Sequence, residues 1–548
     1  MPDSPVGGRP RLYRNGSVYS AADPFATAML VDGDTVAWVG SEQAASSLAD
    51  SSMEVVDLDG ALVTPGFVDS HVHITETGVA LSSLDLSGAA SLAQVLDLVA
   101  GAAARTSGTI LGHGWDETRW PEGRPPTAEE LDRASGGIAV FLSRVDVHSA
   151  VVSWSLADRL DLATMDGWLG KGQVVRDAHR RAAEAAHSFP PEERGSYQLA
   201  ALRHAASRGY VALAEMGAPH VAPPEDLRML VRWDSEGETA GRLPRVLPYW
   251  GQLVGSTEEA RSLLAGLGAG VLGLAGDLNI DGSIGSRTAL LRTPYADAPA
   301  EHGTRYLTVE QVTAHLAATS ELGIQAGFHV IGDAGMDIAV EGLKAAAGQV
   351  GADKVRAAGH RLEHAEMADA GTIAALKEFA VTVSVQPMFD AAWGGTDGLY
   401  GKRLGTERGP ALNPVADYFA AGVPVCFGSD SPVTPLTPWA SVRACVMHRT
   451  PAQRISARAA FLGHTRAGWR AARSRNPMEG QLVPGAPASF AVWEVEQLMV
   501  QVADERVQSW STDPRARTPL LPALDTGTDP RCLQTVRDGV ELYRSSDF

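Results

Sequence analysis

The amino-acid sequence predicts an α/β fold in which a (β/α)8 TIM-like barrel carries a small β-sandwich built from both chain termini. Three observations indicate this fold. The 548 residues suffice for a large barrel and a smaller companion. Residues 63–474 alternate strand-like apolar runs with amphipathic helical segments, which is typical of a parallel sheet. Residues 1–62 and 475–548 are instead rich in short strand and turn signals, as expected for two parts of one sandwich.

The N-terminal part contains a β-hairpin signature. Residues 27–31 and 35–40 are strand-like runs that flank Asp32-Gly33-Asp34, where glycine can supply the positive φ of a tight turn. The far end of the chain has similar segments at 489–493 and 536–543. These blocks are the predicted strands of the sandwich.

The middle of the chain contains more strand candidates than a barrel can hold, so some must lie outside it. The candidates are 67–73, 109–113, 138–144, 210–215, 245–249, 271–280, 324–329, 361–364, 381–386 and 423–428. Helices are predicted between them, such as 308–322, opened by a Thr308/Gln311 capping box, and 334–350.

Metal-competent side chains recur where these strands end. His71 and His73 are separated by one residue, so on a strand both imidazoles point the same way. His329, His364 and Asp430 each follow another apolar run, at the end of the barrel where catalytic groups gather. Singly, a histidine could satisfy a carbonyl, and Asp430 could cap a helix. Five in the same register favour a divalent cation site.

Eight segments resemble the amidohydrolase superfamily, in the branch called amidohydrolase family 3, which includes N-substituted formamide deformylases. They cover nearly the whole chain: VTPGFVDSHVH, GHGWDETRWPEGRPPTAEELDR, FLSRVDVHSA, IDGSIGSRTALL, GFHVIGDAG, RLEHAE, GSDSPV and GQLVPGAPASFAVW. The first, fourth and seventh are specific in combination.

The resemblance implies a metal-dependent hydrolase, with zinc as the default ion because imidazoles plus a carboxylate suit it. The implied ligands are His71, His73, His329 and Asp430. An ion there would generate hydroxide near neutral pH to attack a carbonyl carbon. Asp430 would carry the proton from the nucleophile to the leaving nitrogen. His364 would either bind a second metal or polarise the carbonyl oxygen.

One departure from the family concerns the number of ions. Many two-metal relatives place a carboxylated lysine four residues before the aspartate of the Asp-Gly-Ser motif, where this chain has Asp277. One ion is therefore favoured over two. A second ion would need a substitute bridge, either Asp277 or Glu215. Otherwise Asp277 is a solvated loop carboxylate, and Glu215 is the partner of a histidine that lies behind the metal ligands.

The resemblance also suggests groups for substrate recognition. The candidates are Trp115, Asp116, Trp120, Asp146, His148, Asp281, Ser283 and Arg287. Each tryptophan could equally be core packing, and Arg287 could pair with a substrate carboxylate or with Asp281.

We therefore expect hydrolysis of a non-peptide C–N bond in a small amide, formamide or cyclic amide. The alternatives are a deaminase of an amidine-like ring or a catalytically silent barrel that binds a small molecule. A net charge of −19 argues against nucleic-acid or anionic-membrane partners. Three scattered cysteines and the lack of a leader or long apolar run predict a cytoplasmic protein, and a homodimer is compatible with this kind of barrel.

Overall fold

The centre of the protein is a parallel sheet of eight strands, seen in a computed structural model that describes residues 9–548 except 107, 269, 502–509, 512–518 and 526. The strands are β7 (Phe67–Val72), β13 (Tyr210–Gly217), β14 (Arg245–Trp250), β15 (Gly273–Leu274), β16 (Gln325–Val330), β17 (Arg361–His364), β18 (Thr382–Val385) and β19 (Val425–Phe427). A parallel bridge between Val72 and Ser431 brings the last strand back to the first. The predicted (β/α)8 barrel is confirmed.

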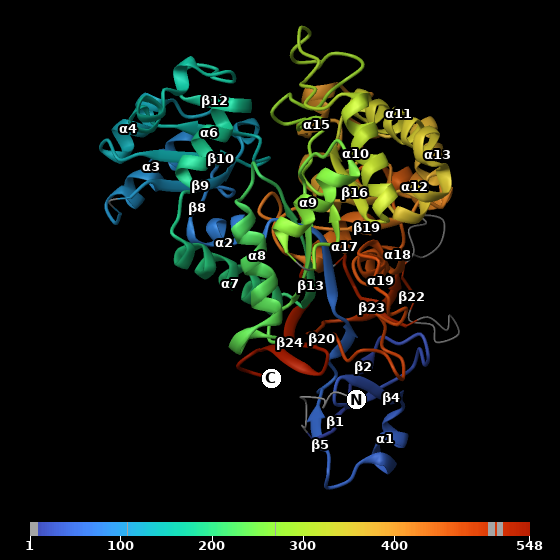
Figure 1. Cartoon of the computed structure of the whole chain (residues 1–548). Coiled ribbons are helices and arrows are strands. Elements are labelled where there is room, and N and C mark those ends of the chain that lie inside the picture. The colour runs from blue at the N-terminus through green and yellow to red at the C-terminus, as the bar shows by residue number, and fades with distance from the viewer. Residues whose placement is uncertain (1–8, 107, 269, 502–509, 512–518, 526) are drawn as a thin grey trace.

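Helices surround the strands of this barrel or line its mouth (Figure 1). They are α2 (Ile74–Ser82), α7 (Pro191–Ser207), α8 (Pro224–Ser235), α9 (Thr257–Leu267), α10 (Val309–Leu322), α11 (Asp333–Val350), α12 (Ala352–Ala358), α13 (Ala370–Glu378), α14 (Pro387–Trp393), α15 (Leu399–Leu404), α16 (Val415–Ala421), α17 (Pro438–Val446), α18 (Ala457–Gly463) and α19 (Arg466–Ala471). The Thr308/Gln311 capping box predicted before α10 is formed. Among the described residues, no helix combines the length and the apolar character that crossing a membrane requires.

A separate lobe is inserted between α2 and α7 (Figure 1). It contains β8 (Leu84–Asp85), β9 (Ile110–Trp115), β10 (Val140–Arg144), β11 (Ser149–Val152) and β12 (Gln173–Val175), with α3 (Leu92–Ala103), α4 (Ala128–Ser135), α5 (Trp154–Ala157) and α6 (Arg176–Ala186). The candidates 109–113 and 138–144 are β9 and β10, which belong to this five-stranded sheet and not to the barrel. Their polarity pattern could not reveal this, because it reports burial and not which sheet a strand joins.

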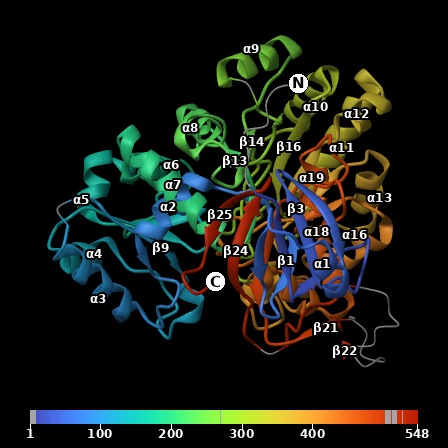
Figure 2. The same cartoon turned by 90° about the horizontal axis from the view of Figure 1, so that it is seen from below.

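Both ends of the chain meet in the small β-sandwich, as predicted (Figure 2). Its strands are β1 (Arg11–Arg14), β2 (Ser17–Val18), β3 (Ala28–Asp32), β4 (Thr35–Gly40), β5 (Glu54–Asp57), β6 (Leu62–Pro65), β20 (Phe490–Glu494), β24 (Arg531–Arg537) and β25 (Val540–Arg544), with α1 (Glu42–Leu48) beside them. In one sheet, β6 pairs with β20, and β20 pairs with β24. The short strands β21 (Leu498–Gln501), β22 (Trp510–Ser511) and β23 (Leu521–Pro522) form a further small sheet. Residues 1–8, part of the N-terminal stretch read as lacking a leader, lie outside the described residues.

β15 ends at Leu274, six residues before the end of the predicted strand 271–280. Gly276 adopts φ +104°, and a Cβ there would lie 3.1 Å from the sulfur of Met216, so the backbone turns where only glycine fits. The following residues form one isolated parallel bridge, Asn279 with His329. This turn carries Asp277 across the mouth of the barrel.

Candidate metal centre

The two histidines at the end of β7 point into the barrel mouth together, as period-2 geometry requires. Their ring centroids lie 5.3 Å apart. His71 is fully buried and His73 nearly so. In both, Nε2 faces the same carboxylate oxygen, Oδ1 of Asp430, at 3.3 Å.

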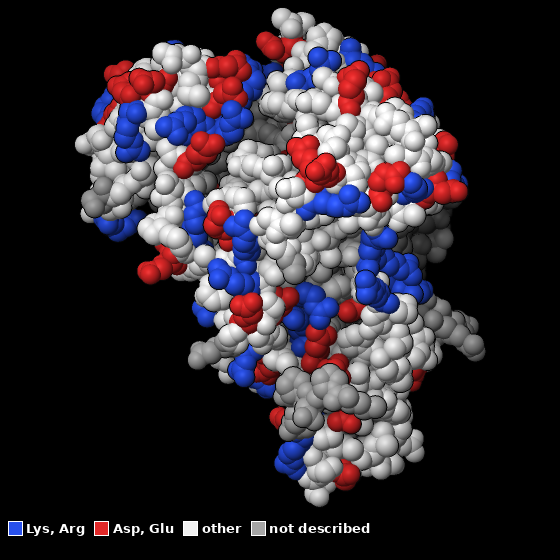
Figure 3. Space-filling model, viewed as in Figure 1, with Lys and Arg blue, Asp and Glu red and all other residues white. Residues whose placement is uncertain are grey.

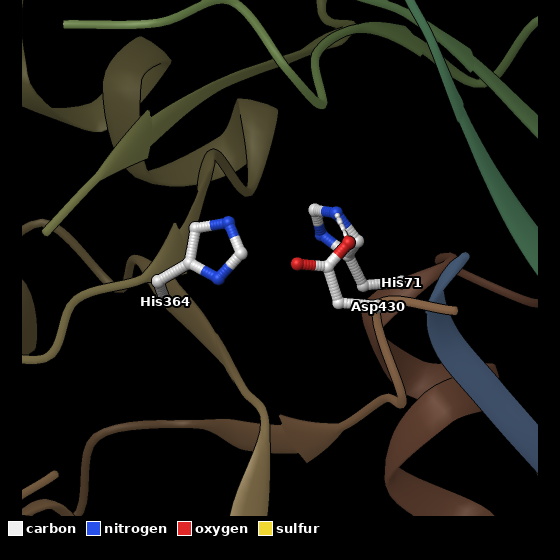
Figure 4. Close-up of side chains that lie close together, drawn as sticks. All are labelled: His71, His364 and Asp430. Carbon is white, nitrogen blue, oxygen red and sulfur yellow. Dashed lines mark ion pairs between the residues drawn. The ribbon is translucent and has the colours of Figure 1, made fainter. Parts of the chain in front are cut away.

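Asp430 follows β19, the last strand in the order of the barrel sheet, whereas His71 and His73 lie at the end of β7, the first. Its backbone N–H donates to the carbonyl of His71 across 2.8 Å, which continues the closure between β19 and β7. The residue has φ +55°, a left-handed conformation, and His364 has φ +69°. Strained backbone of this kind persists where the surroundings enforce it, often at functional sites. Figure 4 shows the Asp430 carboxylate beside His71, with one oxygen turned toward His364.

Asp277 completes a compact group of four donors. Its Oδ1 lies 3.6 Å from Nε2 of His71, and its Oδ2 lies 3.2 Å from Nε2 of His73. Ligand atoms around a tetrahedral zinc ion with bonds of about 2.0–2.1 Å are roughly 3.3 Å apart. The spacings of Asp277 and Asp430 to the two histidines are close to this value. His329, which the resemblance placed in this set, is more distant, with Nδ1 3.9 Å from Asp277 Oδ1.

His329 and His364 form an adjoining donor group with Asp277, in which all ligand atoms lie within 4.8 Å of one another. The two rings are 4.5 Å apart. His329 Nε2 contacts the carbonyl of Gly282 at 3.3 Å, and His364 Nδ1 contacts Gln386 Oε1 at 2.7 Å. Both contacts are to acceptors, so these nitrogens carry the protons and the opposite nitrogens retain lone pairs. Each of the two histidines can therefore ligate an ion while neutral.

Unpartnered polar atoms also indicate that these residues suit a cation. Within the described part of the chain, His71 Nε2 and Asp277 Oδ1 are buried without a hydrogen-bond partner. Native proteins leave few such atoms, and a bound ion is one of the explanations for them. A divalent cation between them would satisfy both.

The local charges favour a cation as well. Burial opposes protonation of His71, but Asp430 and Glu363 outweigh it and raise its pKa to about 10. Burial would raise the pKa of Asp277, yet His73 and His71 hold it well below its usual value. Both carboxylates, Asp277 and Asp430, are thus ionised at neutral pH and favour positive charge between them.

A residue that the sequence analysis did not single out, Glu363, fixes the orientation of His71. Glu363 Oε2 lies 2.8 Å from His71 Nδ1, so that Nε2 is presented to the centre. Arg361 holds Glu363 through two contacts of 2.5 and 3.0 Å. Both come from the Arg-Leu-Glu-His segment, where two charged residues on one face of a fully buried strand were the available signal.

Several candidates from the sequence occupy other positions. Glu215 Oε2 accepts from the backbone of Ile74 at 2.7 Å and belongs to none of the donor groups found among the described residues. Burial raises its pKa to about 7. It therefore supports the start of α2, and of the two suggested bridging residues only Asp277 lies between the histidines.

Three suggested substrate-binding residues have partners within the protein. Trp115 is fully buried in the core of the inserted lobe, and its Nε1 donates to the carbonyl of Leu142. Asp281 is fully buried and accepts from three backbone N–H groups at 2.8–2.9 Å. Arg287 pairs with Asp297, not with Asp281. Packing and internal partners therefore already engage these side chains, and their contact with a substrate stays a prediction.

Asp116 and Trp120 also serve the lobe. Asp116 accepts a hydrogen bond from the backbone N–H of Thr118 and lies 3.3 Å from Arg144. Trp120 is buried, and its Nε1 donates a hydrogen bond to the carbonyl of Ala89. These contacts explain the Gly-Trp-Asp-Glu-Thr-Arg-Trp segment as a folding element.

The other three suggested residues, Asp146, His148 and Ser283, line a cavity beside the centre. Asp146 accepts hydrogen bonds from Ser283 Oγ at 2.8 Å and from Ser286 Oγ at 2.7 Å. Burial would raise the pKa of Asp146, but the positive charge of Arg144 outweighs it and lowers this pKa to about 2. This small chamber has a free volume of about 30 Å³. Its lining comprises Asp146, His148, Ser283, Ile284, Gly285, His329, Ile331, His364, Glu366, Phe389, Trp393, Leu399, Tyr400, Asp430 and Val433.

A larger cavity, the interlobe cleft, opens on the other side of the centre. It has a volume of about 420 Å³, within the usual range for ligand pockets. The barrel contributes His73, Glu76, His220, Asp277, Asn279 and Tyr306, and the lobe contributes Leu111, His113, Phe141, Ser143, Arg176, His179 and Arg180. His148 lines both cavities. Figure 3 shows the molecule hollowed between lobe and barrel, with acidic and basic side chains interspersed on the face drawn.

Comparison with known proteins shows a similarity that extends over most of the chain. The profile of a family described as "Amidohydrolase family" matches residues 54–543. Protein LONG AFTER FAR-RED 3 of Arabidopsis thaliana is 27% identical over 88% of this chain and 86% of its own length. N-substituted formamide deformylase of Arthrobacter pascens is 24% identical over 80% of this chain and 84% of its own length. The crystal structure of an uncharacterized metal-dependent hydrolase from Pyrococcus furiosus is 26% identical, with a TM-score of 0.67 over 88% of this chain and 98% of that one.

Proposed function

Since the chain belongs to the amidohydrolase family, we propose that it is a metal-dependent hydrolase of a small amide, formamide or cyclic amide, cleaving a C–N bond other than a peptide bond. The observation that carries the proposal is that Asp277 and Asp430 each face both His71 and His73, with carboxylate oxygens 3.2–3.6 Å from the Nε2 atoms. This spacing suits one tetrahedral ion, and zinc matches the two-imidazole, two-carboxylate donor set. A bound ion would polarise a carbonyl and lower the pKa of water.

Asp430 is the proposed proton carrier. Its Oδ1 faces both histidines, whereas the other carboxylate oxygen points toward His364 (Figure 4). In the proposed reaction that oxygen would accept the proton released by the attacking water and pass it to the leaving nitrogen. Such transfer by a positioned carboxylate accelerates reactions by about 10²–10⁴-fold.

His364 has two proposed roles, of which one fits its contacts better. A hydrogen bond from His364 to a carbonyl oxygen would need a proton on Nε2, but the proton sits on Nδ1, against Gln386. Burial lowers the pKa of His364, which disfavours the doubly protonated ring. We therefore infer that His364 offers a lone pair to the centre, with His329 and Asp277, as a weaker second set of donors.

The proposed bond type draws support from the relatives. One relative acts on N-substituted formamides, as its name states, and a structural neighbour is named a metal-dependent hydrolase. Both proteins are 24–26% identical to this chain, so they support metal-dependent hydrolysis as the reaction type more than they support a particular substrate. A small amide is therefore the class to test first.

The test is a screen of N-formyl, N-acyl, hydantoin and aminopurine compounds against zinc-loaded protein, with amine and ammonia release measured separately. We expect turnover of at least one N-formyl or N-acyl compound. Ammonia release from aminopurines alone would establish a deaminase instead. No turnover with zinc or manganese, although binding is seen, would identify a silent binding protein.

A further inference from the structure

Asp146 is a buried carboxylate that uses only one of its two oxygens. Its Oδ2 accepts hydrogen bonds from Ser283 and Ser286 and lies 3.2 Å from Nη1 of Arg144. Its Oδ1 is buried and has no hydrogen-bond partner among the described residues, although Asp146 is only 6% exposed. An ionised carboxylate only accepts hydrogen bonds, so a group that satisfies Oδ1 must bring a donor.

The free oxygen belongs to a residue that lines the small chamber beside the metal centre. Asp430, His329 and His364 line the same chamber. Its volume of about 30 Å³ leaves room for about two water-sized groups. A group in so small a space contacts opposite walls at once. Whatever satisfies Asp146 there must therefore also lie beside the metal centre.

The polar groups on the metal side of the chamber are acceptors. His329 and His364 direct their N–H groups to acceptors away from the centre, and they present lone pairs to it. Asp430 is an ionised carboxylate and likewise only accepts. This side of the chamber therefore supplies no donor for Asp146.

The remaining polar side chains of the lining leave little to donate. Ser283 already donates its hydroxyl proton to Oδ2 of Asp146. Tyr400 and Glu366 are hydrogen-bonded to each other. His148 can either donate or accept. Because acceptors prevail, the chamber suits a group that brings its own N–H.

The direction of proton transfer places such a group there. Asp430 is the proposed proton carrier to the leaving nitrogen, and it lines the chamber. The leaving nitrogen must come within its reach, and a hydrogen that this nitrogen already carries then meets Oδ1 of Asp146. The nitrogen becomes positively charged as it takes up the proton. An ionised carboxylate shielded from water stabilises that charge.

We propose that Oδ1 of Asp146 binds the hydrogen on the leaving nitrogen, so that the protein acts on primary and secondary amides, cyclic ones included, and rejects nitrogens that carry no hydrogen. This inference rests on the proposed hydrolysis and adds which nitrogen the site accepts. Water adds its hydroxyl to the carbonyl carbon, and its proton passes through Asp430 to the nitrogen as the C–N bond breaks. Asp146 keeps its charge throughout.

Binding tests the inference without turnover. Acetohydroxamic acid and N-methylacetohydroxamic acid chelate zinc through the same two oxygens and differ only in N–H against N–CH₃. Calorimetry with zinc-loaded full-length protein should show the N–H compound binding about 100-fold more tightly, because the methyl compound leaves a buried charged acceptor unsatisfied.

Variants separate hydrogen bonding from the size of the chamber. Asp146→Asn keeps the volume but removes the charge, so the preference for N–H should fall about tenfold. Glu117→Gln is the matched control, since Glu117 also pairs with Arg144, at 2.9 Å, but belongs to neither cavity lining. It should retain the wild-type preference.

Turnover gives a second comparison. Asp146→Asn should lower kcat/KM for acetanilide at least tenfold, whereas kcat/KM for phenyl acetate, which has no N–H, should change less than threefold. N-methylacetanilide should be a poor substrate of the wild-type protein. The variant and the wild type are compared on each compound, so differences in chemical reactivity cancel.

The outcomes distinguish the two proposals. Equal wild-type affinity for both hydroxamates would mean that water satisfies Oδ1, and would overturn the inference. A preference that Asp146→Asn leaves intact would assign it to size and also overturn the inference, as would an equal loss in Glu117→Gln. Equal cleavage of acetanilide and its N-methyl derivative would refute the inference but not hydrolysis. Selective N–H binding that depends on Asp146, with no cleavage of any amide, would support the contact and refute hydrolysis.

Discussion

His71 and Glu363 lie 2.8 Å apart, Nδ1 to Oε2, and both side chains are fully buried. Glu363 fixes the orientation of the His71 ring and makes Nε2 of His71 a stronger metal ligand. Replacing Glu363 by Gln should therefore weaken zinc binding about 10–100-fold, as loss of such a partner does in other metal sites. Competition with a chromogenic chelator measures the affinity.

The substitution also breaks the pair with Arg361, so a control must separate folding from binding. Asp226→Asn removes a buried carboxylate paired with Arg194 at 2.9 Å, outside the donor groups. It should lower stability but leave zinc affinity within about threefold. Equal zinc affinity in Glu363→Gln and wild type would contradict the orienting role.

Asp277 should determine metal content. Zinc-loaded wild-type protein is expected to hold one tightly bound ion per chain, and Asp277→Asn should lower the affinity by at least 100-fold because two of its contacts lie within the compact group. Glu215→Gln is the matched control, since it removes the other suggested bridging carboxylate. Elemental analysis after dialysis measures both variants. Full zinc content in Asp277→Asn would exclude it as a ligand.

Asp430 should matter for turnover. Asp430→Asn preserves size but removes the proton-accepting carboxylate, so kcat should fall about 10²–10⁴-fold with folding intact. Circular dichroism and zinc content check the fold and the centre, and Asp417→Asn, at an exposed helix position, serves as control. Near-wild-type turnover in Asp430→Asn would refute the proton-carrier role.

Gly428 should be irreplaceable for packing. A Cβ there would lie 2.5 Å from the backbone nitrogen of His71, so Gly428→Ala must displace β7 or β19. We expect lower thermal stability together with weakened zinc binding. Gly348→Ala, in α11 with open space around the added methyl, should be neutral or stabilise by about 0.5–1 kcal/mol. The prediction fails if the two alanine variants have the same melting temperature and zinc affinity.

Buried neutral histidines should make the protein sensitive to acid. His360 accepts from the backbone of Ala326 at 2.9 Å and contacts Ser320 Oγ at 2.9 Å, and burial lowers its pKa to about 3. The unfolded chain takes up this proton near its ordinary pKa of about 6.5. The contribution of His360 to the free energy of unfolding should therefore be constant above pH 6.5. Between pH 6.5 and pH 3 it should fall by about 1.4 kcal/mol per pH unit.

Denaturant midpoints between pH 7 and 5 measure the effect. His360→Gln should lower stability at pH 7 but make it less dependent on pH over this interval. His302→Gln, at an exposed position, is the control and should retain the wild-type slope. An unchanged slope in His360→Gln would contradict the assigned protonation.

The strand-end histidines were predictable because their information is local. His71 and His73 share a face by strand period alone, and closing a barrel brings the ends of its parallel strands together. The Thr308 cap and the Asp32-Gly33 turn likewise depend on neighbouring residues only. These elements appear in the structure as the sequence predicted.

The tertiary structure decided the rest, because it depends on the path of the backbone between elements. The turn at Gly276 brings Asp277 against His71 and His73, where 271–280 had been expected to continue as a strand. Strand pairing assigned residues 109–113 and 138–144 to a separate lobe, and this lobe creates the cleft. The sequence by itself determined the barrel, the sandwich and the residue types available for a metal; contacts between distant segments determined which of them face each other.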